Sequence, residues 1–275
     1  MRGDGLAIAG EAFGNDGAPP VLFFHGGGQS RSAWRGSARA VGAAGYLGIA
    51  FDLRGHGDSE WASDGDYLLD AYARDVAALL GQFERPVTLV GASRGGQASL
   101  VAASHNPECV RLVMLADVAP MMRDDGVDGI RAFYAEGAAG FASLVEAADS
   151  LARHLGQPRM ADPSRLAKAL RPDADGRWHW RWDPATGDPQ FLHPQSEGEA
   201  LLEAAAHVRS PVVLVRAEHS NLLTDEGVER FRQLAPQLDV RIARGVGHMF
   251  TADRNEGFAA DLLDVLARTP ERIAA

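Results

Sequence analysis

The chain has 275 residues, of which 46% are hydrophobic and 23% charged, and its formal net charge is −10. This length is enough to bury the core of one large α/β domain, and the acidic balance argues against a partner with a phosphate backbone. The one cysteine, Cys109, excludes an intramolecular disulfide, and no apolar run approaches the length of a membrane span or a secretory signal, so we expect a cytoplasmic protein.

Short apolar runs alternate with amphipathic helical patterns, which predicts βαβ units and a mostly parallel sheet. Residues 21–24 (VLFF) are apolar at successive positions, as is typical of a strand buried on both faces. Tyr72, Val76, Leu79 and Phe83 recur at helical spacing and predict a helix between the second and third strands. The six predicted strands cover residues 21–24, 46–51, 87–90, 111–115, 211–215 and 240–243, and a last helix is predicted from about residue 253.

Residues 120–207 interrupt this alternation. The segment lacks strand-like runs and is too long for a loop, so we interpret it as a helical cap inserted between the fourth and fifth strands. The core would then comprise residues 1–119 and 208–275. In an extended segment, Trp178, Trp180 and Trp182 would share one face, which is consistent either with lining an apolar pocket or with packing inside the cap.

Residues 91–95 (GASRG) match the pattern G-x-S-x-G directly after a predicted strand. This pattern forms a sharp strand-to-helix turn that exposes the serine hydroxyl at the edge of the sheet. Ser93 is therefore the candidate nucleophile, and the N–H of Arg94 points toward a developing oxyanion.

Residues 25–28 (HGGG) end the first predicted strand and are similar to the glycine-rich segment that supplies a second oxyanion donor. Glycine lets the main chain approach a tetrahedral oxygen closely, and we assign Gly27 as that donor, with Gly26 beside it. We interpret His25 as a structural hydrogen-bonding residue rather than a base.

His248 lies on a glycine-flanked loop between the last predicted strand and the last predicted helix. An imidazole at this place can reach Ser93 and act as general base near neutral pH. The other histidines form no metal-binding spacing, so we expect no metal site and no cofactor.

These motifs and their order resemble the α/β-hydrolase superfamily over essentially the whole chain, in particular its capped bacterial esterases and cofactor-free haloperoxidases. The segment DLRGHGDS (residues 52–59) carries part of the resemblance. The resemblance implies an α/β-hydrolase fold, with a mostly parallel sheet flanked by helices. Epoxide hydrolases of this superfamily use an aspartate nucleophile, and the serine at position 93 differs from that pattern.

The acid of the triad is the open question. The family usually places it after the strand that follows the cap, and the residue at that position is Asn221. An amide cannot stabilise an imidazolium as a carboxylate does. Asp117, at the end of the fourth predicted strand, and Glu218 are the alternative acids, and a site without a carboxylate is the third alternative.

The sequence thus predicts a serine hydrolase that acts on an ester, thioester or lactone of a mainly apolar small molecule. Trp34, Trp180 and Met249 are expected to line its pocket. Asn221 favours, as an alternative, a cofactor-free non-hydrolytic enzyme that catalyses C–C bond cleavage, a lyase or oxygenase reaction, or perhydrolysis. A ligand-binding protein on the same scaffold is a third alternative. We expect no nucleic-acid or membrane partner, and the sequence leaves a homodimer open.

Overall fold

The fold was obtained as a computed structural model, which describes residues 1–156, 158–188, 194–248 and 255–270. Its centre is a seven-stranded sheet in the order β1-β3-β2-β4-β5-β8-β9, in which β1 is antiparallel and the other neighbouring strands are parallel. The strands are β1 (Gly10–Phe13), β2 (Pro20–Phe24), β3 (Leu47–Phe51), β4 (Val87–Ala92), β5 (Val110–Ala116), β8 (Val212–His219) and β9 (Leu238–Gly247).

The six strands predicted from apolar runs all form. β2, β3, β4 and β5 are buried at every position, because helices cover both faces of the sheet. β1 was not predicted, since its four residues GEAF alternate half-exposed and exposed positions at the sheet edge and carry no apolar run. The result is the mostly parallel sheet flanked by helices that the sequence predicted.

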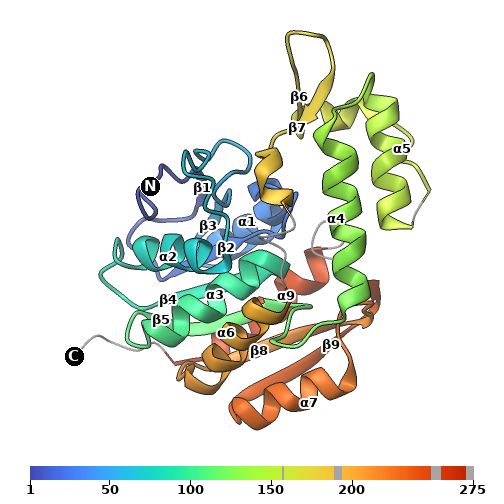
Figure 1. Ribbon diagram of the computed structural model, residues 1–275. Coiled ribbons are helices and arrows are strands. Elements are labelled where there is room, and N and C mark those ends of the chain that lie inside the picture. The colour runs from blue at the N-terminus through green and yellow to red at the C-terminus, as the bar shows by residue number, and fades with distance from the viewer. Residues whose placement is uncertain (157, 189–193, 249–254, 271–275) are drawn as a thin grey trace.

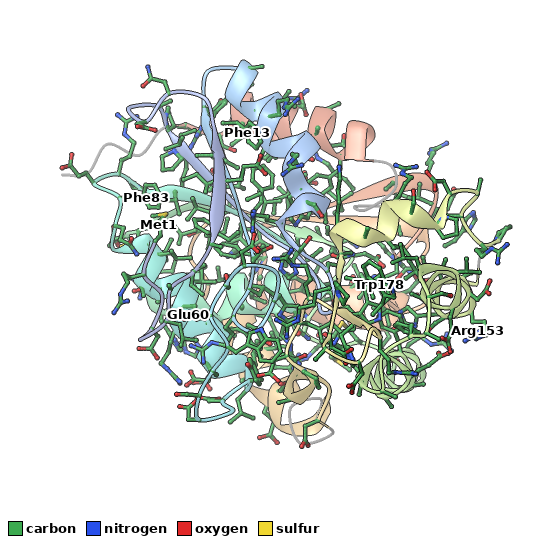
Figure 2. All side chains as sticks on the ribbon, turned by 90° about the horizontal axis from the view of Figure 1, so that it is seen from above. Met1, Phe13, Glu60, Phe83, Arg153 and Trp178 are labelled. Atoms are coloured by element: carbon green, nitrogen blue, oxygen red, sulfur yellow. The ribbon has the colours of Figure 1, made fainter. Side chains whose placement is uncertain are left out.

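Helices pack on both faces of this sheet (Figure 1). Buried side chains of α2, α3, α6 and α7 form one core with one face of the strands, and those of α1 and α9 form a second core with the other face. The view from above separates these two layers clearly (Figure 2). The helices are α1 (Arg35–Ala43), α2 (Leu69–Leu80), α3 (Ser93–His105), α6 (Pro194–His207), α7 (Asp225–Leu234) and α9 (Asn255–Arg268), with a 3-10 helix η1 (Arg31–Trp34) before α1.

The elements that lie between β5 and α6 in the chain stand over one end of the sheet, and we refer to them as the cap (Figure 1). It has its own aromatic core, in which Phe133, Trp180 and Trp182 pack together. The sequence predicted a helical cap, but residues 170–180 form a β-hairpin. Its strands are short, and the tryptophan-rich segment contains no strand-like apolar run that would predict them. Its elements are α4 (Asp124–Ala138), α5 (Leu144–Leu155), η2 (Pro163–Lys168), β6 (Leu170–Pro172), β7 (Trp178–Trp180) and η3 (Pro184–Gly187).

The expected cap range of 120–207 includes one helix that packs on the sheet. Leu201, Ala204 and Ala205 of α6 are buried in the core shared with α2 and α3, so α6 is a core helix. The carboxyl ends of the parallel strands face the cap, which is where ligands bind in open α/β sheets. Within the described residues, no helix is long and apolar enough to cross a membrane.

Candidate active site

Ser93 lies at the junction of β4 and α3, where the backbone bends sharply. Its φ is +45°, and the described residues contain only one other non-glycine residue with positive φ, Asp117 at +49°. This left-handed region is unfavourable for side chains with a Cβ, and such strain gathers at functional positions. The two strained residues are the candidate nucleophile and a candidate acid.

The glycines around Ser93 are required by close packing of the backbone. A Cβ atom on Gly91 would lie 2.4 Å from the Cα of Gly96, and one on Gly95 would lie 2.5 Å from the carbonyl oxygens of Phe24 and His25. Side chains at these positions would push α3 away from β2 and β4. The G-x-S-x-G pattern therefore allows the helix to start directly against the strand ends.

His248 follows β9 and contacts a carboxylate. Its Nδ1–H donates to Oδ2 of Asp117 at 2.8 Å, although the two residues are 131 positions apart in the chain. Asp117 follows β5 directly and is completely buried, whereas the His248 side chain is 16% exposed. Since Nδ1 carries the proton, Nε2 of His248 is left as the basic nitrogen.

Two further donors hold the Asp117 carboxylate. The N–H of Ala217 donates to Oδ1 at 2.9 Å, and the hydroxyl of Ser220 donates to Oδ2 at 2.7 Å. The Ser220 hydroxyl in turn accepts from the N–H groups of Leu222 and Leu223, so the loop after β8 is folded around it. These hydrogen bonds fix the orientation of the Asp117 carboxylate.

The other two alternatives for the acid lie elsewhere. Asn221 is exposed and lines the cavity, and within the described part of the chain it forms no hydrogen bond to His248. Glu218 accepts from the N–H of Gly245 at 2.7 Å. Thus Asp117 is the carboxylate that the structure places against His248, in place of Asn221 at the expected position.

The glycine segment after β2 is ordered by hydrogen bonds on both sides of Gly27. The N–H of Gly26 donates to Oε1 of Gln29 at 3.0 Å, and the N–H of Gly28 donates to Nε2 of His56 at 3.1 Å. No described residue accepts from the N–H of Gly27. The amide of Arg94 belongs to the first turn of α3, where backbone N–H groups point out of the helix end.

Two buried histidines brace this segment in their neutral form. Nδ1–H of His25 donates to the carbonyl of Gly26, while its Nε2 accepts from the N–H of Leu53. Nδ1–H of His56 donates to the carbonyl of Arg54. Burial lowers the pKa of His25 and lowers that of His56 to about 3, so both stay neutral. The structural role expected for His25 is confirmed.

A cavity of about 1120 Å³ separates the cap from the strand ends and reaches Ser93 and His248. Gly26, Gly27, Arg94 and Trp180 line it, as expected from the sequence. Trp34 does not: it is completely buried in the core with Phe23 and Phe258, and its Nε1–H donates to the carbonyl of Phe24, so its predicted pocket role is wrong. Met249 lies outside the described residues.

Sequence reasoning missed two side chains at this site. The hydroxyl of Tyr134, on cap helix α4, would lie 2.9 Å from a Cβ atom on Gly27, so it occupies the space beside the expected oxyanion donor. Burial raises the pKa of Tyr134 to about 12, which keeps the hydroxyl protonated. Ser220 is the second. Neither residue belongs to a sequence motif, because only long-range folding brings Tyr134 next to Gly27 and Ser220 next to Asp117.

The Arg94 side chain is held by an acidic side chain of α6 and lies over an aromatic ring of α2. Its guanidinium pairs with Glu197 of α6 at 2.9 Å and lies 5.6 Å from the ring centroid of Tyr72. This pair connects the start of α3 with α6 on the cavity wall. Within the described residues, no cluster of histidine, cysteine or acidic side chains could hold a metal ion.

Comparisons with known proteins agree with this fold. Residues 19–254 match the model of the alpha/beta hydrolase fold family. The esterase Rv0045c of Mycobacterium tuberculosis is 28% identical over 86% of this chain and 79% of its own length. The 2-(acetamidomethylene)succinate hydrolase of Mesorhizobium japonicum is 28% identical over 84% of this chain and 81% of its own length.

Among solved structures, E-2-(acetamidomethylene)succinate hydrolase superposes with a TM-score of 0.83 at 25% identity, over 95% of this chain and 96% of that one. The chain therefore belongs to the α/β-hydrolase fold family. It is an enzyme, a hydrolase of the esterase type.

Proposed function

We propose that this enzyme is a serine hydrolase in which Ser93, His248 and Asp117 form the catalytic triad. The observation that carries the proposal is the 2.8 Å contact between His248 Nδ1 and the buried Asp117 carboxylate. It supplies the element that the sequence left open, an acid that orients the imidazole and stabilises its protonated form.

In the proposed reaction, Nε2 of His248 removes the proton of Ser93 while Oγ attacks the carbonyl carbon of an ester, thioester or lactone. The N–H groups of Gly27 and Arg94 stabilise the oxyanion, and the positive end of α3 adds to this stabilisation. His248 then gives the proton to the leaving alcohol, thiol or ring oxygen, and an acyl-enzyme remains on Ser93.

Water completes the cycle. His248 removes a proton from the water molecule, the hydroxide attacks the acyl carbon, and Ser93 leaves with the proton returned by His248. Trp180, Trp182 and Phe133 of the cap line the cavity. Their rings favour an apolar segment in the substrate next to the reacting carbonyl.

The amide of Asn221 at the expected acid position was the reason to favour a non-hydrolytic enzyme. With Asp117 against His248, that reason is removed, and the structure offers no separate observation in favour of a non-hydrolytic enzyme or a ligand-binding protein. Hydrolysis is accordingly the single function that we propose.

The test combines turnover with covalent labelling. The wild-type protein should release p-nitrophenol from p-nitrophenyl butyrate, and a fluorophosphonate probe should add one phosphonyl group to the peptide that contains Ser93. Ser93→Ala should lower turnover by about 10³-fold or more and abolish the labelling.

Ser104→Ala is the matched control, because Ser104 lies on the same helix and its hydroxyl donates to the carbonyl of Val101. It should keep both turnover and labelling. Turnover by Ser93→Ala at the wild-type rate would refute the proposal. Labelling of Ser93 without hydrolysis of any ester would show a reactive serine that serves another reaction.

A further inference from the structure

The cavity wall carries the opposite charge from the protein as a whole. The chain has a net charge of −10. Six cationic but only three acidic side chains line the described cavity. A cavity lined by one sign of charge concentrates ligands of the other sign. The cations are Arg31, Arg35, Arg94, Arg165, Lys168 and Arg181, and the acids are Asp52, Asp58 and Glu197.

The three acidic side chains of the cavity wall all form salt bridges with arginines. Arg31 pairs with both Asp52 and Asp58, Arg181 pairs with Asp58, and Arg94 pairs with Glu197. These contacts neutralise the inner wall and brace the loops beneath the cap. Arg35 pairs with Glu11, which does not line the cavity.

The surplus positive charge lies on Arg165 and Lys168. Neither forms a salt bridge with any of the residues that the structure describes. Both side chains are exposed and line the cavity. The neighbouring Asp162 attracts Arg165 electrostatically, but its carboxylate accepts from the N–H and the hydroxyl of Ser164 and does not line the cavity.

The local fold places these two cations side by side. They are three residues apart in η2, a 3-10 helix, and this helix has three residues per turn, so positions i and i+3 project on the same side. Leu166 between them is buried in the cap core and fixes the orientation of the helix. The N–H of Arg181 donates to the carbonyl of Ala169, which connects the end of η2 to the segment that follows β7.

We propose that Arg165 and Lys168 bind a carboxylate of the substrate at the end remote from the scissile bond. The substrate class is then an anionic ester: a half-ester of a dicarboxylic acid, or a related acyl compound with a terminal carboxylate. Its apolar middle part lies along the aromatic wall, and its reacting carbonyl lies at Ser93. This inference rests on the proposed serine hydrolase function.

A length-matched pair of esters tests the proposal. p-Nitrophenyl valerate and mono-p-nitrophenyl glutarate have the same leaving group and the same number of acyl carbons, but only the glutarate ends in a carboxylate. We expect kcat/KM of the wild type to be about tenfold higher for the glutarate half-ester, as charge-assisted hydrogen bonds would give. The advantage should shrink as NaCl is raised from 0.05 to 0.5 M.

The double variant Arg165→Gln/Lys168→Gln should bring the ratio of the two kcat/KM values to about one. The matched control is Arg153→Gln/Arg159→Gln, which removes two cap cations paired with Glu136 and Asp149 outside the cavity. Arg153 lies at the outer edge of the cap (Figure 2). This control changes the net charge equally and should preserve the ratio. Equal kcat/KM values in the wild type, or a preference that survives in the first variant, would overturn the proposal.

Binding to the Ser93→Ala protein separates this proposal from the proposed function. Calorimetry should give tighter binding of monomethyl glutarate than of methyl valerate, and Arg165→Gln/Lys168→Gln in that background should abolish the difference. Lack of turnover of both p-nitrophenyl esters by the wild type would refute the hydrolase proposal alone. Equal binding of the two methyl esters would refute the carboxylate site alone.

Discussion

Replacement of Asp117 with asparagine isolates the contribution of the buried acid. The carboxylate accepts three hydrogen bonds, from Ala217 N–H, Ser220 Oγ–H and His248 Nδ1–H. Asparagine has nearly the same size but only one acceptor oxygen. If that oxygen serves Ala217, the amide NH₂ faces His248 and favours the tautomer with its proton on Nε2. That tautomer cannot accept the proton of Ser93.

The corresponding change in a serine protease lowers kcat by about 10⁴, which equals roughly 5.5 kcal/mol of transition-state stabilisation. We expect a loss of that order for Asp117→Asn, measured as steady-state hydrolysis of p-nitrophenyl butyrate. Circular dichroism and the thermal midpoint would show that the variant is folded. The rate of fluorophosphonate labelling should fall in parallel, since the same base activates Ser93 in both reactions.

Asn221→Asp is the companion variant. Asn221 is exposed and has no hydrogen bond to His248 among the described residues, so its replacement should change kcat/KM by no more than about threefold. A rise of orders of magnitude would show that position 221 supplies the acid after all. Asp117→Asn with more than about a tenth of wild-type activity would refute the reasoning from the other side.

Three further predictions follow from the site and its supports. Tyr134→Phe removes the hydroxyl beside Gly27 and should lower kcat about tenfold in steady-state kinetics; an unchanged kcat would restrict Tyr134 to packing. Gly95→Ala places a Cβ 2.5 Å from two carbonyl oxygens and should lower the free energy of unfolding in urea by about 1–3 kcal/mol or more, whereas Gly36→Ala, with open space around it, should not destabilise. The folded-state pKa of His56, about 3, lies below its ordinary value of 6.5 because of burial, so the unfolded chain binds the proton first. The contribution of His56 to the free energy of unfolding should therefore be fully present above pH 6.5 and be lost as the pH drops toward 3. In His56→Gln, the urea midpoint should change less between pH 7 and 4.5 than it does in the wild type. An equally steep profile in that variant would assign the acid sensitivity to other groups.

Local patterns in the sequence were sufficient to predict the sheet and the sharp strand-to-helix turn at Ser93. Strands such as β2 and β4 are apolar at every position, because a parallel sheet covered on both faces needs no polar positions. The glycines around Ser93 could be recognised for the same kind of reason, since a Cβ atom at Gly91 or Gly95 would lie only 2.4–2.5 Å from backbone atoms. Such requirements act between neighbours along the chain or between adjacent strands.

Elements and side chains whose residue type is not dictated by packing against their neighbours were harder to predict from the sequence. The edge strand β1 and the hairpin β6–β7 are three or four residues long, and the tryptophans of β7 are as consistent with a helical cap as with a strand. Trp34 is similar: an aromatic residue beside a glycine-rich loop fits a pocket wall and a core equally well, and its burial against Phe258 of the last helix decides between them.

Which side chain contacts His248 is decided by the tertiary structure. Asp117 and Asn221 both follow a strand at the carboxyl edge of the sheet, so the sequence places both near the imidazole. The chain reversal around Ser220 turns its hydroxyl and the N–H of Ala217 toward Asp117, and His248 arrives from a strand more than a hundred residues later. Hydrogen-bond direction between distant segments decides which side chain meets His248, and no local pattern encodes that direction. The sequence by itself therefore determined the scaffold and the turn that carries Ser93. Only the folded structure brought the Asp117 carboxylate to His248 and placed the cationic pair of η2 on the cavity wall.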